Sequence, residues 1–175
     1  MFVTAVLPPG NILADLRNVK TTLFRKYGLT SVYAFPPLIP LALSTDEPEE
    51  PEWHSVYRQP ARITLGNLEN NDGHIVIPTH DISVLRDIAS QLPIEHSNDI
   101  NILPLFSLYL GERENIDFGS VESIAVDAET AGVRWKRSML IGLEFIPSTK
   151  SEWWNGSVLT YLWSRSLKSP RRTPE

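Results

Sequence analysis

Two apolar stretches decide the fold that this sequence predicts: PLIPLALS at residues 37–44 and ILPLFSLY at residues 102–109. Each follows a proline-containing approach and a long pattern of strand and helix signals, so the two look like one strand that occurs twice. A strand repeated in two similar settings predicts a two-lobed molecule with a groove between the lobes. Neither stretch carries a side chain that exchanges a proton near neutral pH.

The composition indicates one well-buried domain. The chain has 175 residues, of which 42% are hydrophobic, a net charge of -5 and no cysteine. The missing cysteine excludes disulfides, thiolate catalysis and cysteine metal sites, and we expect no metal or other cofactor. The first apolar run ends at Pro8 with no basic region before it, and no stretch reaches the ~20 apolar residues of a membrane span. We therefore expect a cytoplasmic protein.

The charge is unevenly distributed along the chain. Residues 165–175 carry four basic side chains against one acidic side chain, and the rest of the chain is acidic. An acidic body differs from the basic face of most nucleic-acid-binding scaffolds. We expect the basic residues to form a solvated terminus, with a polyanion as the alternative partner.

The first fifty residues predict one helix between strands. Residues 2–7 indicate a strand, and Asn11 and Gly28 stand where the N-cap and the C-terminal stop of a helix are expected. Residues 30–35 indicate a second strand before the first doubled stretch. Residues 45–52 are acidic and interrupted by prolines, which predicts a loop.

The middle of the chain predicts a hairpin and a second helix. Residues 62–68 and 74–77 have strand patterns, and the sequence NNDG at residues 70–73 is strong turn chemistry. Asp81 is the expected N-cap of the second helix, which Pro93 closes.

The last third predicts three strands and a helix. The second doubled strand is expected over about residues 101–110, and closing strands over residues 121–126 and 135–145. A C-terminal helix is expected over residues 153–167, because Trp154, Val158, Leu162 and Arg165 fall on one helical stripe.

These elements together predict an α+β protein in which helices cover two pseudo-symmetric, antiparallel lobes. We assign residues 1–147 to a single two-lobed domain, and residues 148–175 to a tryptophan-rich helix followed by the basic tail.

The arrangement resembles the 2H phosphoesterase superfamily, the LigT-like fold of RNA 2′,3′-cyclic phosphodiesterases and so-called 2′-5′ RNA ligases. The likeness covers most of residues 1–147: an opening strand that ends in a proline turn, a helix, and then the doubled strands. Residues 62–68 look like a linking element of the family, and residues 121–124, 132–135 and 143–145 look like its closing strands. Two buried core strands unrelated to this family are the alternative.

The resemblance implies two motifs of histidine, apolar residue, threonine or serine, and apolar residue. In active members one histidine is the general base and the other the general acid, and the hydroxyls hold the phosphate. Here the first motif falls on residues 40–43, with Pro40 in place of the histidine and Ala42 in place of the hydroxyl. The second falls on residues 105–108, where Leu105 replaces the histidine and only Ser107 keeps its role. We therefore expect a catalytically degenerate protein.

A rival register places the first motif on Arg62 and Thr64. Arginine can hold a phosphate but stays protonated, so it cannot act as the base. An active phosphodiesterase that uses Arg62, Thr64 and Tyr109 is the alternative function. The four histidines of the chain are each expected to be surface or capping residues.

The leading hypothesis is a binding or interaction module with its ligand in the groove, a nucleotide or RNA being one candidate. Alternate positions of a strand share a face, so the groove is expected to expose Pro40, Ala42, Ser44, Leu105, Ser107 and Tyr109. Ser44, Ser107 and Tyr109, with Arg62 and Thr64, are the expected ligand-binding residues. A largely apolar groove of this kind binds a flat or apolar ligand, or is filled by neighbouring side chains.

Three tryptophans crowd the C-terminal segment: Trp153, Trp154 and Trp163. We expect them to be buried on the body of the same chain or across a twofold axis in a homodimer. A partner surface or a membrane-surface helix is the alternative. An oligomeric interaction protein without a ligand groove is thus a third possible class.

Overall fold

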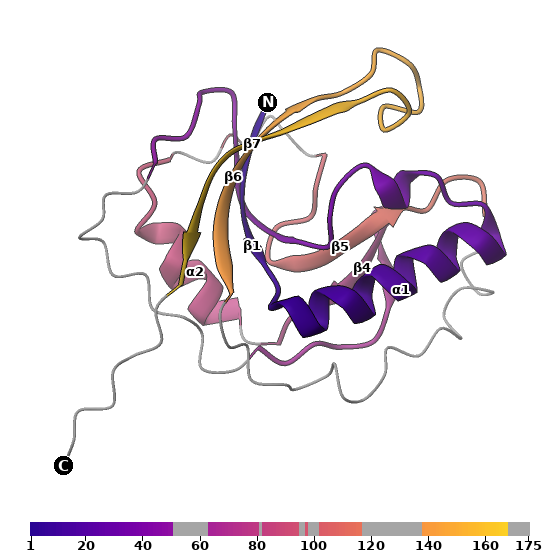
Figure 1. The fold of residues 1–175 in the computed structure, drawn as a ribbon, viewed down its shortest axis with the longest axis horizontal. Helices are drawn as coiled ribbons and strands as arrows, with labels where there is room; N and C mark the ends of the chain where they lie inside the picture. The colour runs from indigo at the N-terminus through magenta and orange to yellow at the C-terminus, as the bar shows by residue number, and fades with distance from the viewer. Residues whose placement is uncertain (51–62, 81, 95–96, 98–101, 117–137, 168–175) are drawn as a thin grey trace.

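Two antiparallel sheets and two α-helices make up the described part of the chain (Figure 1). The computed structural model describes residues 1–50, 63–80, 82–94, 97, 102–116 and 138–167. The elements in chain order are β1 (Phe2–Leu7), α1 (Gly10–Tyr27), the 3-10 helix η1 (Ser31–Tyr33), β2 (Ile39–Ser44), β3 (Glu69–Asn71), β4 (His74–Pro78), α2 (Ile82–Ser90), β5 (Ser107–Glu112), β6 (Met139–Ile146) and β7 (Val158–Ser166). The expected α+β class with antiparallel sheets is confirmed.

The larger sheet has the strand order β2-β1-β6-β7, and the smaller has the order β3-β4-β5. Every neighbouring pair of strands is antiparallel. β1 therefore lies inside the larger sheet, between β2 on one side and β6 on the other. The second doubled strand, expected over about residues 101–110, begins only at Ser107, as β5, and β2 and β5 belong to different sheets.

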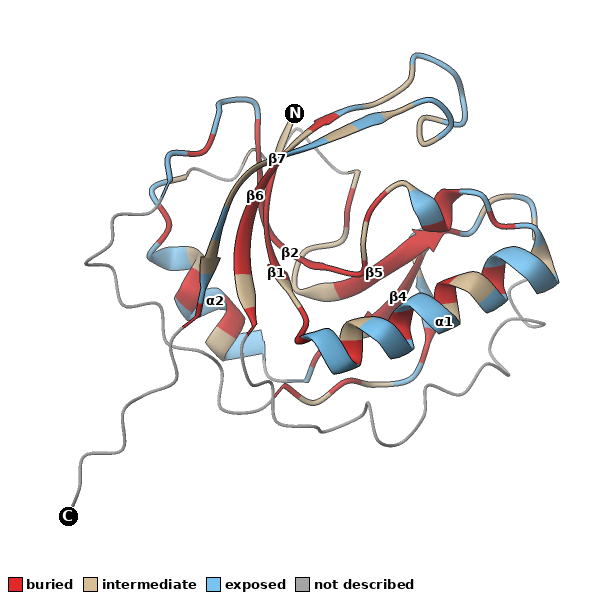
Figure 2. Ribbon diagram, in the orientation of Figure 1, coloured by how far each residue is buried: buried red, intermediate tan, exposed pale blue. Residues whose placement is uncertain are grey.

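The helix α1 forms where the sequence predicts it. Ile12, Leu16, Lys20 and Leu23 face the protein interior, which gives one buried stripe along the helix (Figure 2). Gly28 ends the helix in the left-handed conformation, with φ of 73°, and its N–H donates to the carbonyl of Phe24, as a glycine C-cap does. The expected N-cap is wrong by two residues, because Pro9 holds that position.

The hairpin at the predicted turn is confirmed, but its first strand is shorter and later than expected. Asp72 and Gly73 have positive φ, as a tight two-residue hairpin turn requires. Only β3 pairs with β4 there, and within residues 63–68 one isolated bridge joins Leu65 to Thr79. Arg62 and Asp81 lie outside the described residues.

Residues 30–35 do not form the expected strand. Ser31–Tyr33 is a 3-10 turn, and the prolines that follow it lack N–H donors for a ladder. The N–H of Ser31 donates instead to the carboxylate of Glu114, at 2.8 Å. A carboxylate distant in sequence thus accepts the backbone hydrogen bond that a neighbouring strand would accept in a sheet.

The expected C-terminal helix over residues 153–167 is wrong. Val158–Ser166 is the edge strand β7, which pairs with β6 from Ile146 to Met139. The segment is rich in β-branched and aromatic residues, which favour a pleated surface, and β6 supplies backbone partners that no local pattern reveals. The basic tail, from residue 168 onward, and the strand expected over residues 121–126 lie outside the described residues.

One large apolar cluster lies between the helices and the sheets. It joins Leu16 and Leu23 of α1 and Leu85 and Ile88 of α2 to inward-facing residues of β2, β4, β5 and β6. No helix in the described part of the chain is both long enough and apolar enough to cross a membrane.

Candidate functional site

A second apolar cluster occupies the place where the sequence predicts an open groove. Its members come from β1, β2, β5, β6 and the segment before β2: Val3, Ala5, Phe35, Leu38, Leu43, Leu103, Tyr109, Ile141, Leu143 and Phe145. Phe35 is its centre, with ring centroids 4.5 Å from Phe145 and 5.9 Å from Tyr109. Trp153 packs on the same rings. Large aromatic side chains therefore fill the space between β5 and the larger sheet.

The doubled strands do approach each other at their starts. The N–H of Phe106 donates to the carbonyl of Pro40, and the N–H of Tyr109 donates to the carbonyl of Leu38, both at 2.9 Å. Pro40 is buried, and Leu105 is partly buried against the aromatic cluster. The two positions that would carry histidines in the family motifs thus lie on neighbouring segments, where Pro40 is buried and Leu105 is partly buried.

The expectation that six groove residues are exposed is wrong for four of them. Pro40, Ala42, Ser44 and Tyr109 are buried, whereas Leu105 and Ser107 are intermediate. β2 lies inside the fold, where Pro40, Ala42 and Ser44 pair with β1, and Tyr109 is itself a member of the aromatic cluster.

Of the expected ligand-binding residues, Ser44 lies on the larger sheet, Ser107 and Tyr109 lie on the smaller, and Arg62 lies outside the described residues. The hydroxyl of Ser44 accepts the N–H of Asp46 at 3.0 Å. Ser107 lies in the smaller sheet, where it pairs with Pro78 of β4. Thr64 is half-buried, and its carbonyl accepts the N–H of His80.

A buried polar network connects β4 and β5 at the far end of the smaller sheet. His74 and Glu112 pair across the strands, and His74 Nδ1 lies 3.0 Å from Glu112 Oε1. The hydroxyl of Tyr109 donates to the same carboxylate oxygen at 2.7 Å. Burial, and then the charge of Glu112, raise the pKa of Tyr109 well above its ordinary value, so Tyr109 stays a donor and cannot act as a base.

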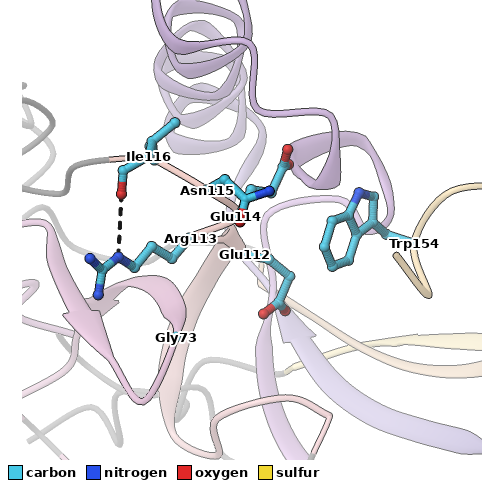
Figure 3. Close-up of a pocket in the computed structure, with 7 residues that line it drawn as sticks. All are labelled: Gly73, Glu112, Arg113, Glu114, Asn115, Ile116 and Trp154. Atoms are coloured by element: carbon cyan, nitrogen blue, oxygen red, sulfur yellow. Dashed lines mark hydrogen bonds between the residues drawn. The ribbon is translucent and has the colours of Figure 1, made fainter. Parts of the chain in front are cut away.

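A pocket of about 620 Å³ opens beside this network. Glu112, Glu114 and Asn115 lie on one side of it and the indole of Trp154 on the other (Figure 3). Glu114 has a positive φ of 52°, which is uncommon for a residue with a side chain. Its carboxylate accepts the N–H of Ser31, so the loop after β5 is fixed against η1.

A second pocket, of about 640 Å³, lies against the same tryptophan. Trp154 Nε1 donates to the hydroxyl of Thr30 at 3.0 Å. Thr30 lines this second pocket together with Trp154, which also lines the first. Lys20 and Arg17 of α1 contribute its basic side chains. Trp154 is therefore common to an acidic pocket and a basic pocket.

Lys20 is the most unusual ionisable residue of the basic pocket. It is 4% exposed, and its Nζ donates to the carbonyl of Phe35 at 2.5 Å. Burial lowers the pKa of Lys20 from 10.5 to about 7, because the charged ammonium loses its hydration.

The residues around the two pockets determine what chemistry this site can perform. His74 is held by a carboxylate, as an acid–base histidine often is. No group of three or more metal-ligating side chains occurs among the described residues. The site offers binding surfaces of opposite charge around one aromatic ring.

Sequence reasoning missed His74, Glu112 and Lys20. The first two lie far apart in the chain and meet only through β-pairing. Lys20 did leave a signal, since it follows Leu16 by four positions and precedes Leu23 by three, which places it on the buried stripe of α1. Comparison with protein-family models and with curated proteins gives no significant match for this chain.

Proposed function

We propose that this chain is a binding or interaction module with a LigT-like architecture that does not perform the 2H phosphodiesterase reaction. One observation carries the proposal: the motif positions hold Pro40, Ala42, Leu105 and Ser107, of which the first two are buried and Leu105 packs against the second apolar cluster. None of these side chains transfers a proton near neutral pH. General acid–base catalysis at this place therefore has neither an acid nor a base.

The ligand site in this proposal moves from the groove to the acidic pocket beside Trp154. The lining has two carboxylates, Glu112 and Glu114, against one guanidinium, Arg113, so this pocket suits a neutral or cationic group better than a nucleotide or RNA. An amine or guanidinium there would face two carboxylates and the indole, whose face attracts cations. A cytoplasmic location belongs to the same proposal.

The deciding experiment is a turnover assay of the purified chain with a 2′,3′-cyclic nucleotide and with a short 2′-5′-linked RNA. The expected rate equals that of a buffer blank, and the Ser107→Ala variant gives the same result. Turnover that survives purification and is lost in Ser107→Ala would overturn the proposal, because it would require a working motif strand.

A second candidate function rests on the pair His74 and Glu112. His74 has 13% side-chain exposure and is oriented by the Glu112 carboxylate at 3.0 Å, and its neighbours Gly73 and Glu112 line the acidic pocket, so it is a candidate general base for a ligand there. This candidate replaces the earlier alternative, because Tyr109 is fully buried and its pKa is raised. Turnover of a cationic or neutral ester that is lost in His74→Gln and kept in Ser107→Ala would favour it.

Self-association is the remaining interaction hypothesis. Trp153 packs on Phe35 and Phe145, and Trp163 Nε1 donates to the carbonyl of Pro48. Trp154 is held by Thr30, so all three indoles have partners within the chain. We propose that a homodimer uses the exposed side chains of Ile146 and Val158, which pair across β6 and β7. Light scattering of the wild type and of Val158→Ser tests this contact.

A further inference from the structure

Lys20 is a buried ammonium or amine without a carboxylate partner among the described residues. Its ammonium donates to a main-chain carbonyl, that of Phe35. A buried cation costs free energy unless it is paired. This cost explains why burial lowers the pKa of Lys20 to about 7, so that the side chain holds its proton only part of the time near neutrality.

The pocket of about 640 Å³ gives this side chain a place to meet a ligand. Arg17 lies three residues earlier on α1 and lines the same pocket, so two basic groups share one wall. Trp154 and Tyr33 contribute aromatic rings, and Pro36 and Leu159 contribute apolar surface. No acidic residue belongs to this lining, as far as the chain is described.

We propose that this pocket binds a small planar organic anion, whose acidic group lies against Arg17 and Lys20 and whose ring lies against Trp154 and Tyr33. The inference rests on the proposed binding role and names the ligand class for the basic side of Trp154. Charge-assisted hydrogen bonds from the guanidinium and the ammonium supply the orientation. The apolar lining excludes water and favours a flat ring over a hydrated inorganic ion.

Binding of an anion must be coupled to protonation of Lys20. A negative charge close to the amine favours its charged form, so the ligand raises the pKa of Lys20 and the protein takes up a proton. The other titratable group that lines the pocket is Tyr33. Tyr161 lies near Arg17, and burial raises its pKa against the opposing effect of Arg17. Glu112 and Glu114 lie in the neighbouring acidic pocket.

Calorimetry with 2-naphthoate and with neutral 2-naphthamide tests the proposal. Titrations at pH 8 in phosphate and in Tris give the number of protons taken up, because the two buffers differ in ionisation enthalpy. We expect 2-naphthoate to bind at least tenfold more tightly than the amide, as a charge-assisted hydrogen bond predicts. Uptake should approach one proton per ligand at pH 8 and fall at pH 6.

Variants assign the effect to the two basic residues. Lys20→Met should lose the proton uptake and bind at least tenfold more weakly, whereas Arg17→Met should bind more weakly and keep the uptake. Lys20→Arg keeps a permanent charge and should bind without proton uptake, so it tests the role of Lys20 even if Lys20→Met folds poorly. Lys26→Met is the matched control, because Lys26 is an exposed residue of the same helix.

Three outcomes would overturn the inference: equal affinity for the anion and the amide, binding without proton uptake in the wild type, or no binding of either compound. The first two leave the chain a binding module with a differently recognised ligand. The third removes this pocket as a ligand site, and the cyclic-nucleotide assay still decides the proposed function separately.

Discussion

The hydroxyl of Tyr109 donates to the carboxylate of Glu112 at 2.7 Å, three positions along the same strand, where both residues are buried. The register of β5 relative to β4 shifts in this region. The same carboxylate oxygen lies 3.0 Å from His74. A single buried acid is therefore held by groups from two strands.

Tyr109→Phe should destabilise the protein by about 1–3 kcal/mol, because it leaves a buried carboxylate with one partner fewer. Urea unfolding followed by circular dichroism measures the loss. Tyr33→Phe is the control, since Tyr33 is 60% exposed, and its change should stay within about 0.5 kcal/mol. Equal effects of the two substitutions would mean that Glu112 does not depend on the phenol.

Lys20 should make the free energy of unfolding depend on pH. The pKa of Lys20 is about 7 in the folded protein and has its ordinary value of 10.5 in the unfolded chain. Between pH 7 and pH 10.5 the unfolded chain therefore binds one more proton than the folded protein. Stability from this group therefore rises with pH above 7, by up to about 1.4 kcal/mol per pH unit. Below pH 7 the penalty of burying the charge is fully present.

The measurement is urea unfolding of the wild type and of Lys20→Met at intervals from pH 6 to pH 9.5. The variant should be more stable than the wild type at pH 6, and the difference should shrink as pH rises. The pH range stops below the ordinary pKa of tyrosine. Above that pH the raised pKa of Tyr109 would make the stability fall with pH, which is opposite to the effect of Lys20. Parallel stability curves would contradict the burial of Lys20.

Gly142→Ala should destabilise the protein by about 1–3 kcal/mol, as overpacking in a core does. The indole of Trp163 lies where a Cβ at position 142 would stand, and the two residues pair across β6 and β7. Gly10→Ala is the control, because nothing lies within 4 Å of a Cβ at the start of α1. Its thermal midpoint should be unchanged or slightly higher.

Histidines introduced at the proposed motif positions should not produce the 2H phosphodiesterase reaction. Pro40→His combined with Leu105→His places one polar ring at a buried position and another against the second apolar cluster, so the thermal midpoint should fall, by an amount equivalent to several kcal/mol. Turnover of a 2′,3′-cyclic nucleotide should remain at the level of the blank. A folded double variant that turns over this substrate would show that the cluster opens to an accessible groove. Leu105→His alone is the reference variant, and it should lower the thermal midpoint less than the double substitution does, because Leu105 is only partly buried.

The elements that local sequence determines were predictable. The stripe of α1, its stop at Gly28 and the turn at Asp72 and Gly73 each depend on neighbouring residues. The segment of β7 has strand-forming composition, but Trp154 and Val158 also fit a helical spacing. Its pairing with β6 decides between the two, and pairing is a non-local property.

The site was less predictable than the fold, for a related reason. Pro40 and Ala42 fall within a strand as the sequence predicts, but whether a groove stays open beside them depends on side chains elsewhere. Phe35 and Phe145 fill it from two distant segments. His74 and Glu112 likewise become partners only once β4 and β5 have paired.

The central position of β1 sets an order for the assembly of the chain. Phe2 pairs with Glu144 on one side and with Ser44 on the other. A nascent chain can form the contact between β1 and β2 early, but the second edge of β1 stays unpaired until β6 has been synthesised. Loops that close so late are slow to form, and an open strand edge invites pairing with other chains. Until β6 pairs with β1, the second edge of β1 can therefore accept a strand from another copy of the chain.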